Sequence, residues 1–554
     1  MIKVLDFIKI KLLKRETVNS DWQIIIINFN LIKGNSLNSL IYCFFKILFI
    51  KLNMLKQLFN VFLIFFTANH FSYAQQIIVA ANDARQIEKN SALFICDGEN
   101  DQVEINNALK NYNNVLLSTG TFKISRTIVG KGSHLSGSGM YDTKIVASGN
   151  INKLIDLGGS ANLIMRLDSL NKSLTRIRLK PAYFSGIEAN DFYLLSSMDV
   201  FNGLRSYYWN GEIIQVKEII PFKELVLTNP IRYNYQKEVK LYKYSFESPE
   251  ISNLSIINNL TPRSILCELH ETNYAKVTNV FVDGKGTAKQ GIRISNSSNI
   301  EISNSKVINV MDSATHQGQQ GYGFYLAGVE NGTIINCEGE SNKHSIEIGG
   351  YMNVPVSTNI TVENIQCKND IQASYSTHGA AEGIRWINCK ATESGGGFML
   401  RSAGNIIINP EIIILHKITN GAFHIGEFTH DGPWNKFDGN GGKDLLIKNA
   451  KVVLGDRNNK SFIYAMDPLE NFVIDGGSWV GSKIDYILNV QALYCNNLVI
   501  KYATFNVSDT SQENALMNLN LKQNNQPHIT LQKNNFIGLQ GNRIESNVGY
   551  IFNQ

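Results

Sequence analysis

The chain has 554 residues, of which 44% are hydrophobic and 18% charged, and this composition excludes an intrinsically disordered protein. Its 43 glycines and many asparagines favour strands joined by tight turns over a helical bundle. The net charge of +5 is local, because residues 1–53 carry eight Lys and Arg against three Asp and Glu, whereas the part from Gln75 onward carries 43 against 44. We therefore expect no nucleic-acid partner.

A secretory signal peptide is predicted for residues 54–74. Met54 precedes the apolar stretch Leu58–Thr67, and Ser72 and Ala74 form a small-x-small cleavage pattern before Gln75. We expect cleavage after Ala74 and a secreted, periplasmic or extracellular protein that has no stable membrane span once mature.

Residues 1–53 fit no targeting pattern, and we interpret them as a mis-assigned extension upstream of the start at Met54. The alternative is an uncleaved membrane anchor at Leu40–Ile50. That run has eleven residues and includes Lys46, which is too short for a hydrocarbon core of ~30 Å. The six cysteines after residue 53 show no CxxC spacing, so we expect buried thiols rather than a disulfide framework or a zinc site.

One short pattern recurs from residue 250 onward: Asn, apolar, any, apolar, any, Asn. Copies are Asn253–Asn258, Asn299–Asn304 and Asn359–Asn364, with degenerate copies after them. Each copy predicts a period-2 strand that must stack on its neighbours to bury one face. Because Asn tolerates left-handed backbone and its amide can bond the same amide one coil away, the pattern predicts Asn ladders. We expect Asn336 and Asn364 to be buried in such a ladder.

The stretch Cys96–Leu109 resembles the capping helix, Asn114–Phe122 the first coil, and residues 191–235 an inserted segment of one known family. The chain resembles the right-handed β-helices of the pectate-lyase-like superfamily, including secreted and phage-tail members. The resemblance implies an all-β, single-stranded right-handed parallel β-helix with an N-terminal capping helix and a β-rich insertion. The implied parts are residues 77–178 (cap and first coils), 179–248 (insertion) and 249–554 (main coils).

The third strand of each coil carries the chemistry-bearing side chains. Strand alternation predicts one inward set: Ile292, Phe324, Ile346, Phe398 and Phe423. It also predicts one outward set: Arg293, Tyr325, Glu347, Met399, Arg401 and His424. Long loops at 310–321, 351–358 and 427–443 border these strands, and insertions in a solenoid mark its binding face.

We expect a polysaccharide site on this face, with coils ~4.8 Å apart. A solvated strand face without a role is the alternative. The expected catalytic residues are His378, His344, Glu347 and Tyr325, which act as base, acid or orienting group. The expected substrate-binding residues are Arg401, Arg293, His424 and Trp434.

The predicted function is metal-independent β-elimination of an acidic glycan, without a cofactor. A divalent cation held by His344, His378 and Glu347 is an alternative. The second enzyme hypothesis is a glycoside hydrolase that pairs Glu347 with another acid, although acids are sparse on these coils. The third is a non-catalytic glycan-binding or adhesion solenoid. The sequence does not indicate the oligomeric state.

Overall fold

The computed structural model divides the chain into Met1–Tyr73 and Ala74–Gln554. The predicted extension and signal peptide lie outside the described residues. The structure describes residues 76–180, 186–202, 205–259, 262–312, 320–418, 421–426, 439–455, 461–508, 515–523, 526–539 and 543–553.

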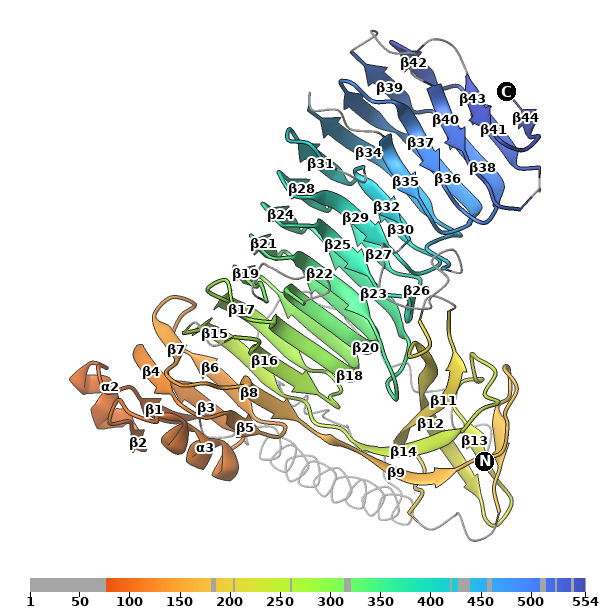
Figure 1. Cartoon of the computed structure of the whole chain (residues 1–554). Helices are drawn as coiled ribbons and strands as arrows, with labels where there is room; N and C mark the ends of the chain where they lie inside the picture. The colour runs from red at the N-terminus through yellow and green to blue at the C-terminus, as the bar shows by residue number, and fades with distance from the viewer. Residues whose placement is uncertain are drawn as a thin grey trace, which may run out of the picture. The chain divides into compact units, whose positions relative to one another are not determined.

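The described chain is an all-β parallel solenoid, as predicted, whose coils each contribute strands to three faces, here called A, B and C (Figure 1). Face A contains β1 (Ile77–Ala80), β3 (Asn114–Leu117), β6 (His134–Gly137), β27 (Arg385–Ile387), β30 (Ile406–Ile408), β38 (Cys495–Lys501), β41 (His528–Gln532) and β44 (Ile551–Asn553). Face B contains β4 (Gly120–Ile124), β7 (Thr143–Ala147), β19 (Lys306–Ile308), β21 (Glu338–Glu340), β24 (Gln366–Lys368), β28 (Lys390–Thr392), β31 (Glu411–Ile414), β39 (Thr504–Val507) and β42 (Asn535–Ile537).

Face C contains β5 (Ile128–Gly130), β8 (Lys153–Gly158), β16 (Ile265–His270), β22 (His344–Gly349), β25 (Ala373–Thr377), β29 (Gly396–Leu400), β32 (Phe423–Ile425), β35 (Ser461–Ala465), β37 (Tyr486–Val490), β40 (Ala515–Leu519) and β43 (Ile544–Ser546). Strands that turn a corner from C to A are β18 (Gln290–Ser303) and β20 (Tyr322–Ile335). Strands that turn from A to B are β15 (Glu250–Ile257), β17 (Lys276–Asp283), β34 (Leu446–Leu454) and β36 (Leu469–Gly481). The other strands of this sheet are β2 (Phe94–Ile95), β23 (Ser357–Glu363), β26 (Ala381–Glu382) and β33 (Gly442–Lys443).

The inward side of face C forms an apolar stack, as predicted. Ile292, Phe324 and Ile346 occupy one register and are fully buried. The rings of Phe398 and Phe423 continue this register and stack at 5.3 Å. Burying such a side chain contributes ~1.5–3 kcal/mol, so the repeated stack holds adjacent coils in register.

Asparagine ladders mark two corners of the solenoid, with left-handed φ angles as the pattern requires. Asn364 donates its amide to Asn336 at 3.2 Å and accepts one from Asn388 at 3.0 Å. The predicted burial of Asn336 and Asn364 is wrong, because the amides stack on the solvent side of the corner and both residues are exposed.

The shared Asn pattern predicts that its copies stack on one another, and for the copy at Asn253 this prediction is also wrong. Leu254 pairs with Val280 in the B segments of β15 and β17, whereas Ile300 lies in the A segment of β18. The physical reason is that strands on both faces follow a left-handed Asn, so their sequences look alike.

Two helices lie near the N-terminal end of the described chain. Helix α3 (Gln102–Asn111) buries Ile105, Ala108 and Leu109 in the core shared with β1–β5. Helix α2 (Gln86–Ser91) buries no residue. The apolar face of α3 therefore covers the first coils.

A second sheet, antiparallel and six-stranded, leaves the solenoid between β8 and β16, which pair directly as neighbouring coils. It has its own core, which includes Tyr193, Val216 and Tyr235. The sheet also takes in strands before residue 179. Its strands are β9 (Ser160–Arg166), β10 (Arg176–Arg178), β11 (Phe192–Val200), β12 (Trp209–Ile220), β13 (Glu224–Leu227) and β14 (Lys240–Ser245).

Polar contacts fasten the second sheet to the solenoid. Arg232 donates to the Thr358 hydroxyl at 2.7 Å and forms an ion pair with Glu330. The amide of Asn202 donates to the Gly379 carbonyl at 2.9 Å. These contacts bring two connections of the second sheet, the one between β11 and β12 and the one between β13 and β14, against the coils of the solenoid.

All six cysteines of the described chain are free and buried, as expected. Burial raises the pKa of the Cys337 thiol to about 12, so this thiol stays protonated at neutral pH. Among the described residues no helix is both long and apolar enough to cross a bilayer.

Candidate functional site

The outward side of face C forms one continuous column, as the alternation predicts. Arg293, Tyr325 and Glu347 pair in register on successive coils. The column continues through Ser376 to Met399. Unlike a solvated strand face, however, Tyr325 and Met399 are each 8% exposed and Glu347 is 0% exposed. The alternative of a simple solvated face is therefore wrong for these coils.

Glu347 lies at the centre of a buried polar cluster. Its Oε1 is 3.1 Å from Nε2 of His378, and its Oε2 is 3.5 Å from a guanidinium nitrogen of Arg401. His378 follows β25 one coil further on, so the two side chains meet across neighbouring coils. The predicted grouping of Glu347, His378 and Arg401 thus exists in the structure.

Two tyrosines complete the surroundings of His378. The Tyr208 hydroxyl lies 2.7 Å from Nδ1, and the Tyr322 hydroxyl lies 3.4 Å from Nε2. Tyr208 comes from the second sheet, immediately before β12, and is 1% exposed. Sequence reasoning missed both tyrosines: Tyr208 lies 170 residues from His378, and no local pattern links them.

The electrostatics of the pair depart from ordinary values. Burial raises the pKa of Glu347 to about 7, although the Arg401 charge and a hydrogen bond from Ser376 act in the opposite direction. Burial, followed by the charge of Arg401, lowers the pKa of His378 well below its usual value. A neutral imidazole therefore faces a carboxyl that titrates near neutral pH, a pattern typical of functional sites.

Arg401 lies inside the cluster rather than at its edge. It is 5% exposed and donates to the Thr377 carbonyl at 2.7 Å and to the Ser376 hydroxyl at 2.6 Å. These contacts and Glu347 occupy the guanidinium, which fits a positioning role better than the predicted grip on substrate. The partly exposed cations are Arg205 and Lys343, which sequence reasoning did not select.

The remaining predicted acid–base residues lie around this cluster without joining it. His344 is buried, and its Nδ1 lies 2.6 Å from the Ala373 carbonyl oxygen. The Tyr325 ring packs 5.1 Å from the Tyr322 ring and does not contact His378. The structure does not bring the ligand atoms of His344, His378 and Glu347 together as a metal site. Among the described residues, the group with three mutually close ligand atoms is Cys96, Asp101 and Glu104.

The other predicted substrate-binding residues are dispersed. His424 is 2% exposed, burial lowers its pKa to about 3, and it lines a cavity of about 300 Å³ together with Met399. Arg293 pairs with Glu268 at 3.1 Å and donates to the Tyr351 hydroxyl at 2.7 Å. Trp434 lies outside the described residues.

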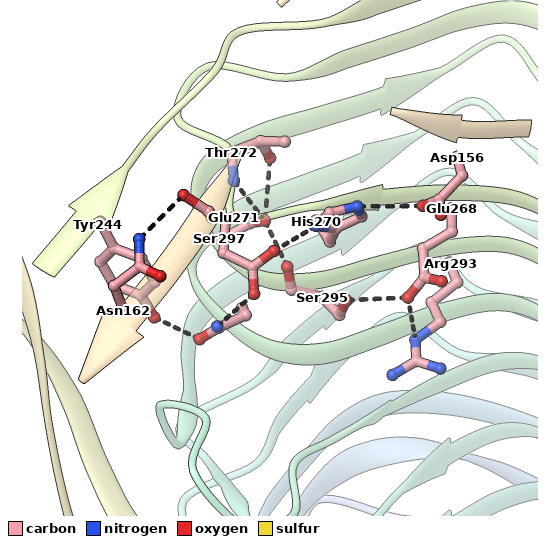
Figure 2. Close-up of polar contacts among 12 residues, drawn as sticks. Asp156, Asn162, Tyr244, Glu268, His270, Glu271, Thr272, Arg293, Ser295 and Ser297 are labelled. Atoms are coloured by element: carbon pink, nitrogen blue, oxygen red, sulfur yellow. Dashed lines mark hydrogen bonds and ion pairs between the residues drawn. The ribbon is translucent and has the colours of Figure 1, made fainter. Parts of the chain in front are cut away.

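A second polar network contains the close acidic pair that the sequence did not reveal (Figure 2). Asp156 and Glu268 face each other on neighbouring coils, and Lys153 Nζ lies 3.2 Å from the first and 2.6 Å from the second. His270 sits between Asp156, at 3.0 Å, and Glu271. Although burial acts to raise it, the pKa of Asp156 is lowered by the hydrogen bond from His270 and by Lys153.

This network is balanced by cations, because Lys153, His270 and Arg293 lie against its carboxylates. Asp467, which is fully buried with a pKa raised by burial to about 7, resembles Glu347 in that respect. The register from Glu347 to Tyr464, three residues before Asp467, spans four coils, or roughly 19 Å. The Asp467 carboxylate accepts a hydrogen bond from the Gly441 amide at 2.9 Å and lies near enough to Arg401 for the guanidinium charge to act on its pKa.

No protein-family model and no curated protein matches the sequence. Solved structures do match. The tailspike protein gp49 from Pseudomonas phage LKA1 is similar with a TM-score of 0.59 at 16% identity, covering 81% of this chain and 76% of that one. The tailspike gp61 of Pseudomonas phage phi297 has a TM-score of 0.52 at 13% identity, covering 78% and 72%.

The Gp54 tailspike of Acinetobacter baumannii bacteriophage AP22, solved in complex with a capsular saccharide, has a TM-score of 0.50 at 15% identity, covering 85% of this chain and 74% of that one. At these identities the likeness concerns the fold alone. The chain therefore has the parallel β-helix fold of phage tailspikes, and the predicted resemblance to the pectate-lyase-like β-helices is confirmed at the level of the fold.

Proposed function

We propose that this chain is a secreted glycan-active protein that cleaves an acidic polysaccharide by β-elimination without a metal ion. The observation that carries the proposal is the line of contacts Tyr208–His378–Glu347, at 2.7 and 3.1 Å. The AP22 tailspike, solved in complex with a capsular saccharide, supports a saccharide as the ligand of this fold.

The Glu347 carboxylate, 3.1 Å from Nε2, keeps the proton of the neutral His378 on that nitrogen, so the Nδ1 lone pair acts as the base. In the reaction, Nδ1 takes the proton from C5 of a uronate, the C4–C5 double bond forms, and the C4–oxygen bond breaks. Tyr208 donates its proton to the leaving oxygen and is reprotonated by His378. Arg205 and Lys343, at the exposed edge, would neutralise the substrate carboxylate.

Mutation of the base tests this proposal. His378→Ala should lower kcat by ~10²–10⁴-fold on whichever acidic glycan the wild type cleaves, with native circular dichroism. Tyr208→Phe, which keeps the ring, should also lower kcat. His134→Ala changes an imidazole that is half exposed on β6 and serves as the matched control. Wild-type activity in His378→Ala would place the chemistry elsewhere.

A glycan-binding protein without catalysis is the second candidate. The burial of Tyr208 and Glu347 favours it, because a polymer cannot touch side chains that are 1% and 0% exposed unless neighbouring residues move. The hydrolase hypothesis is weaker. Among the described residues no second carboxyl is in contact with Glu347, and the Asp156–Glu268 pair is neutralised by Lys153, Arg293 and His270.

A further inference from the structure

The Asn ladder that precedes the strands of face A is interrupted at two coils. Asn359 donates its amide to Asn331 at 2.6 Å, and the ladder resumes at Asp444, three coils beyond Asn359, which accepts from Asn471 at 2.8 Å. Between them the ladder positions are Gly383 and Gly404, with φ of 67° and 70°. Both glycines keep the left-handed backbone of the ladder but remove its side chains.

The removed side chains leave an open groove. A Cβ at Gly383 would meet nothing within 4 Å, and at Gly404 the nearest atom, 3.3 Å away, is the backbone nitrogen of Gly383. The groove has a volume of about 970 Å³ and runs between these glycines and the second sheet. From Thr358 to Lys443 it follows four coils, or roughly 14 Å.

The walls combine aromatic rings with charged side chains of both signs, namely Lys172, Arg232 and Lys443 against Glu382 and Asp444. Phe201 and Tyr233 are half-buried, with ring centroids 5.5 Å apart. The Tyr233 hydroxyl donates to Glu382, which fixes the ring at the wall. Lys172 lines the groove from the second sheet and Lys443 from the coils, and both residues are exposed.

We propose that this groove binds an anionic oligosaccharide. Ring faces such as those of Phe201 and Tyr233 pack on the apolar faces of sugars. Lysines on opposite walls suit carboxylate or sulfate groups along a chain, and an elongated open groove suits a polymer rather than a small compact ligand. The acidic character of the ligand rests on the proposed function, whereas the groove itself rests on the two ladder glycines.

The test restores the ladder. Asn tolerates the φ of both positions, so Gly383→Asn with Gly404→Asn should fold normally and narrow the groove by two side chains. Binding is measured by affinity electrophoresis in gels that contain polygalacturonate, alginate or hyaluronan, with dextran as the neutral polymer. The wild type should be retarded by at least one anionic polymer, and the double variant should bind it at least 10-fold more weakly. Gly286→Asn, at another left-handed glycine with room for a Cβ, should bind like the wild type.

The outcomes separate the groove from the catalytic proposal. Equal retardation of wild type and double variant overturns the groove, whatever the cleavage activity. Retardation that depends on the groove without unsaturated products supports the groove and overturns the proposed elimination. Retardation of the wild type by none of the anionic polymers contradicts both proposals. Native circular dichroism of the double variant is the condition for each comparison.

Discussion

Replacing Glu347 by Gln should stabilise the protein while impairing its activity. Gln has the same size but no charge, and Glu347 is fully buried. Its pKa rises from 4.5 to about 7, which means that the native structure prefers the neutral carboxyl over the carboxylate. Below pH 4.5 the side chain is neutral in both the folded and the unfolded chain, so Gln should then change stability little.

The magnitude follows from linkage. Between pH 4.5 and 7 the native state binds the extra proton, so the stability of the wild type falls as the pH rises. The difference between the two pKa values corresponds to about 3 kcal/mol above pH 7. For the unit Ala74–Gln554, the unfolding entropy of ~2 cal/mol/K per residue converts this into a shift of the melting temperature of about 3 °C.

The assay is thermal unfolding of wild type and Glu347→Gln at pH 4 and pH 8, followed by circular dichroism. The variant should melt about 3 °C higher than the wild type at pH 8 and at nearly the same temperature at pH 4. Glu338→Gln, at a side chain that is 56% exposed, should show no such pH-dependent difference. An equal difference at both pH values would refute the argument that Glu347 is held against its charge.

Asn364→Ala removes the amide hydrogen bonds to Asn336 and Asn388 and places Ala at a φ of 55°, so it should lower the free energy of unfolding by ~1–3 kcal/mol. Asn364→Gly should lower it less, because Gly adopts this φ without strain. A melting temperature of Asn364→Ala equal to that of the wild type would contradict the ladder. Although burial acts to lower it, the pKa of His270 is raised to about 9 by Asp156 and Glu271. Its contribution of ~1–3 kcal/mol to stability should therefore be present below pH 6.5 and be lost as the pH rises through 9. His270→Gln should abolish this pH dependence in unfolding titrations. Arg401→Lys should lower kcat while KM stays unchanged, because Arg401 holds Glu347 rather than substrate, and a raised KM alone would contradict this role.

The repeat and the alternation of face C could be predicted because they are local. Each strand has period 2, and short connections keep successive coils in register, so Phe324, Glu347 and Phe398 were assigned to the correct sides. The copy at Asn253 was misaligned, because an Asn corner precedes strands on two faces and the local sequence does not distinguish them.

The composition of the site could be predicted only in part. Arg401 was expected at the surface because a solenoid face by itself is solvated, but residues from the second sheet cover it. Tyr208 lies within the second sheet and Asp156 lies before it, whereas their partners His378 and Glu268 follow it, so each pair is remote in sequence. Contacts made by tertiary packing leave no periodic signal in the chain.

The mass of the oligosaccharides released from an acidic glycan tests the central claim most directly. Elimination at the Tyr208–His378–Glu347 contacts adds no water across the broken bond, so the new non-reducing ends should carry an unsaturated uronate and absorb in the ultraviolet. The account predicts these products from the wild type and their loss in His378→Ala. Products that each contain one added water, with saturated ends, would show hydrolysis and contradict the account.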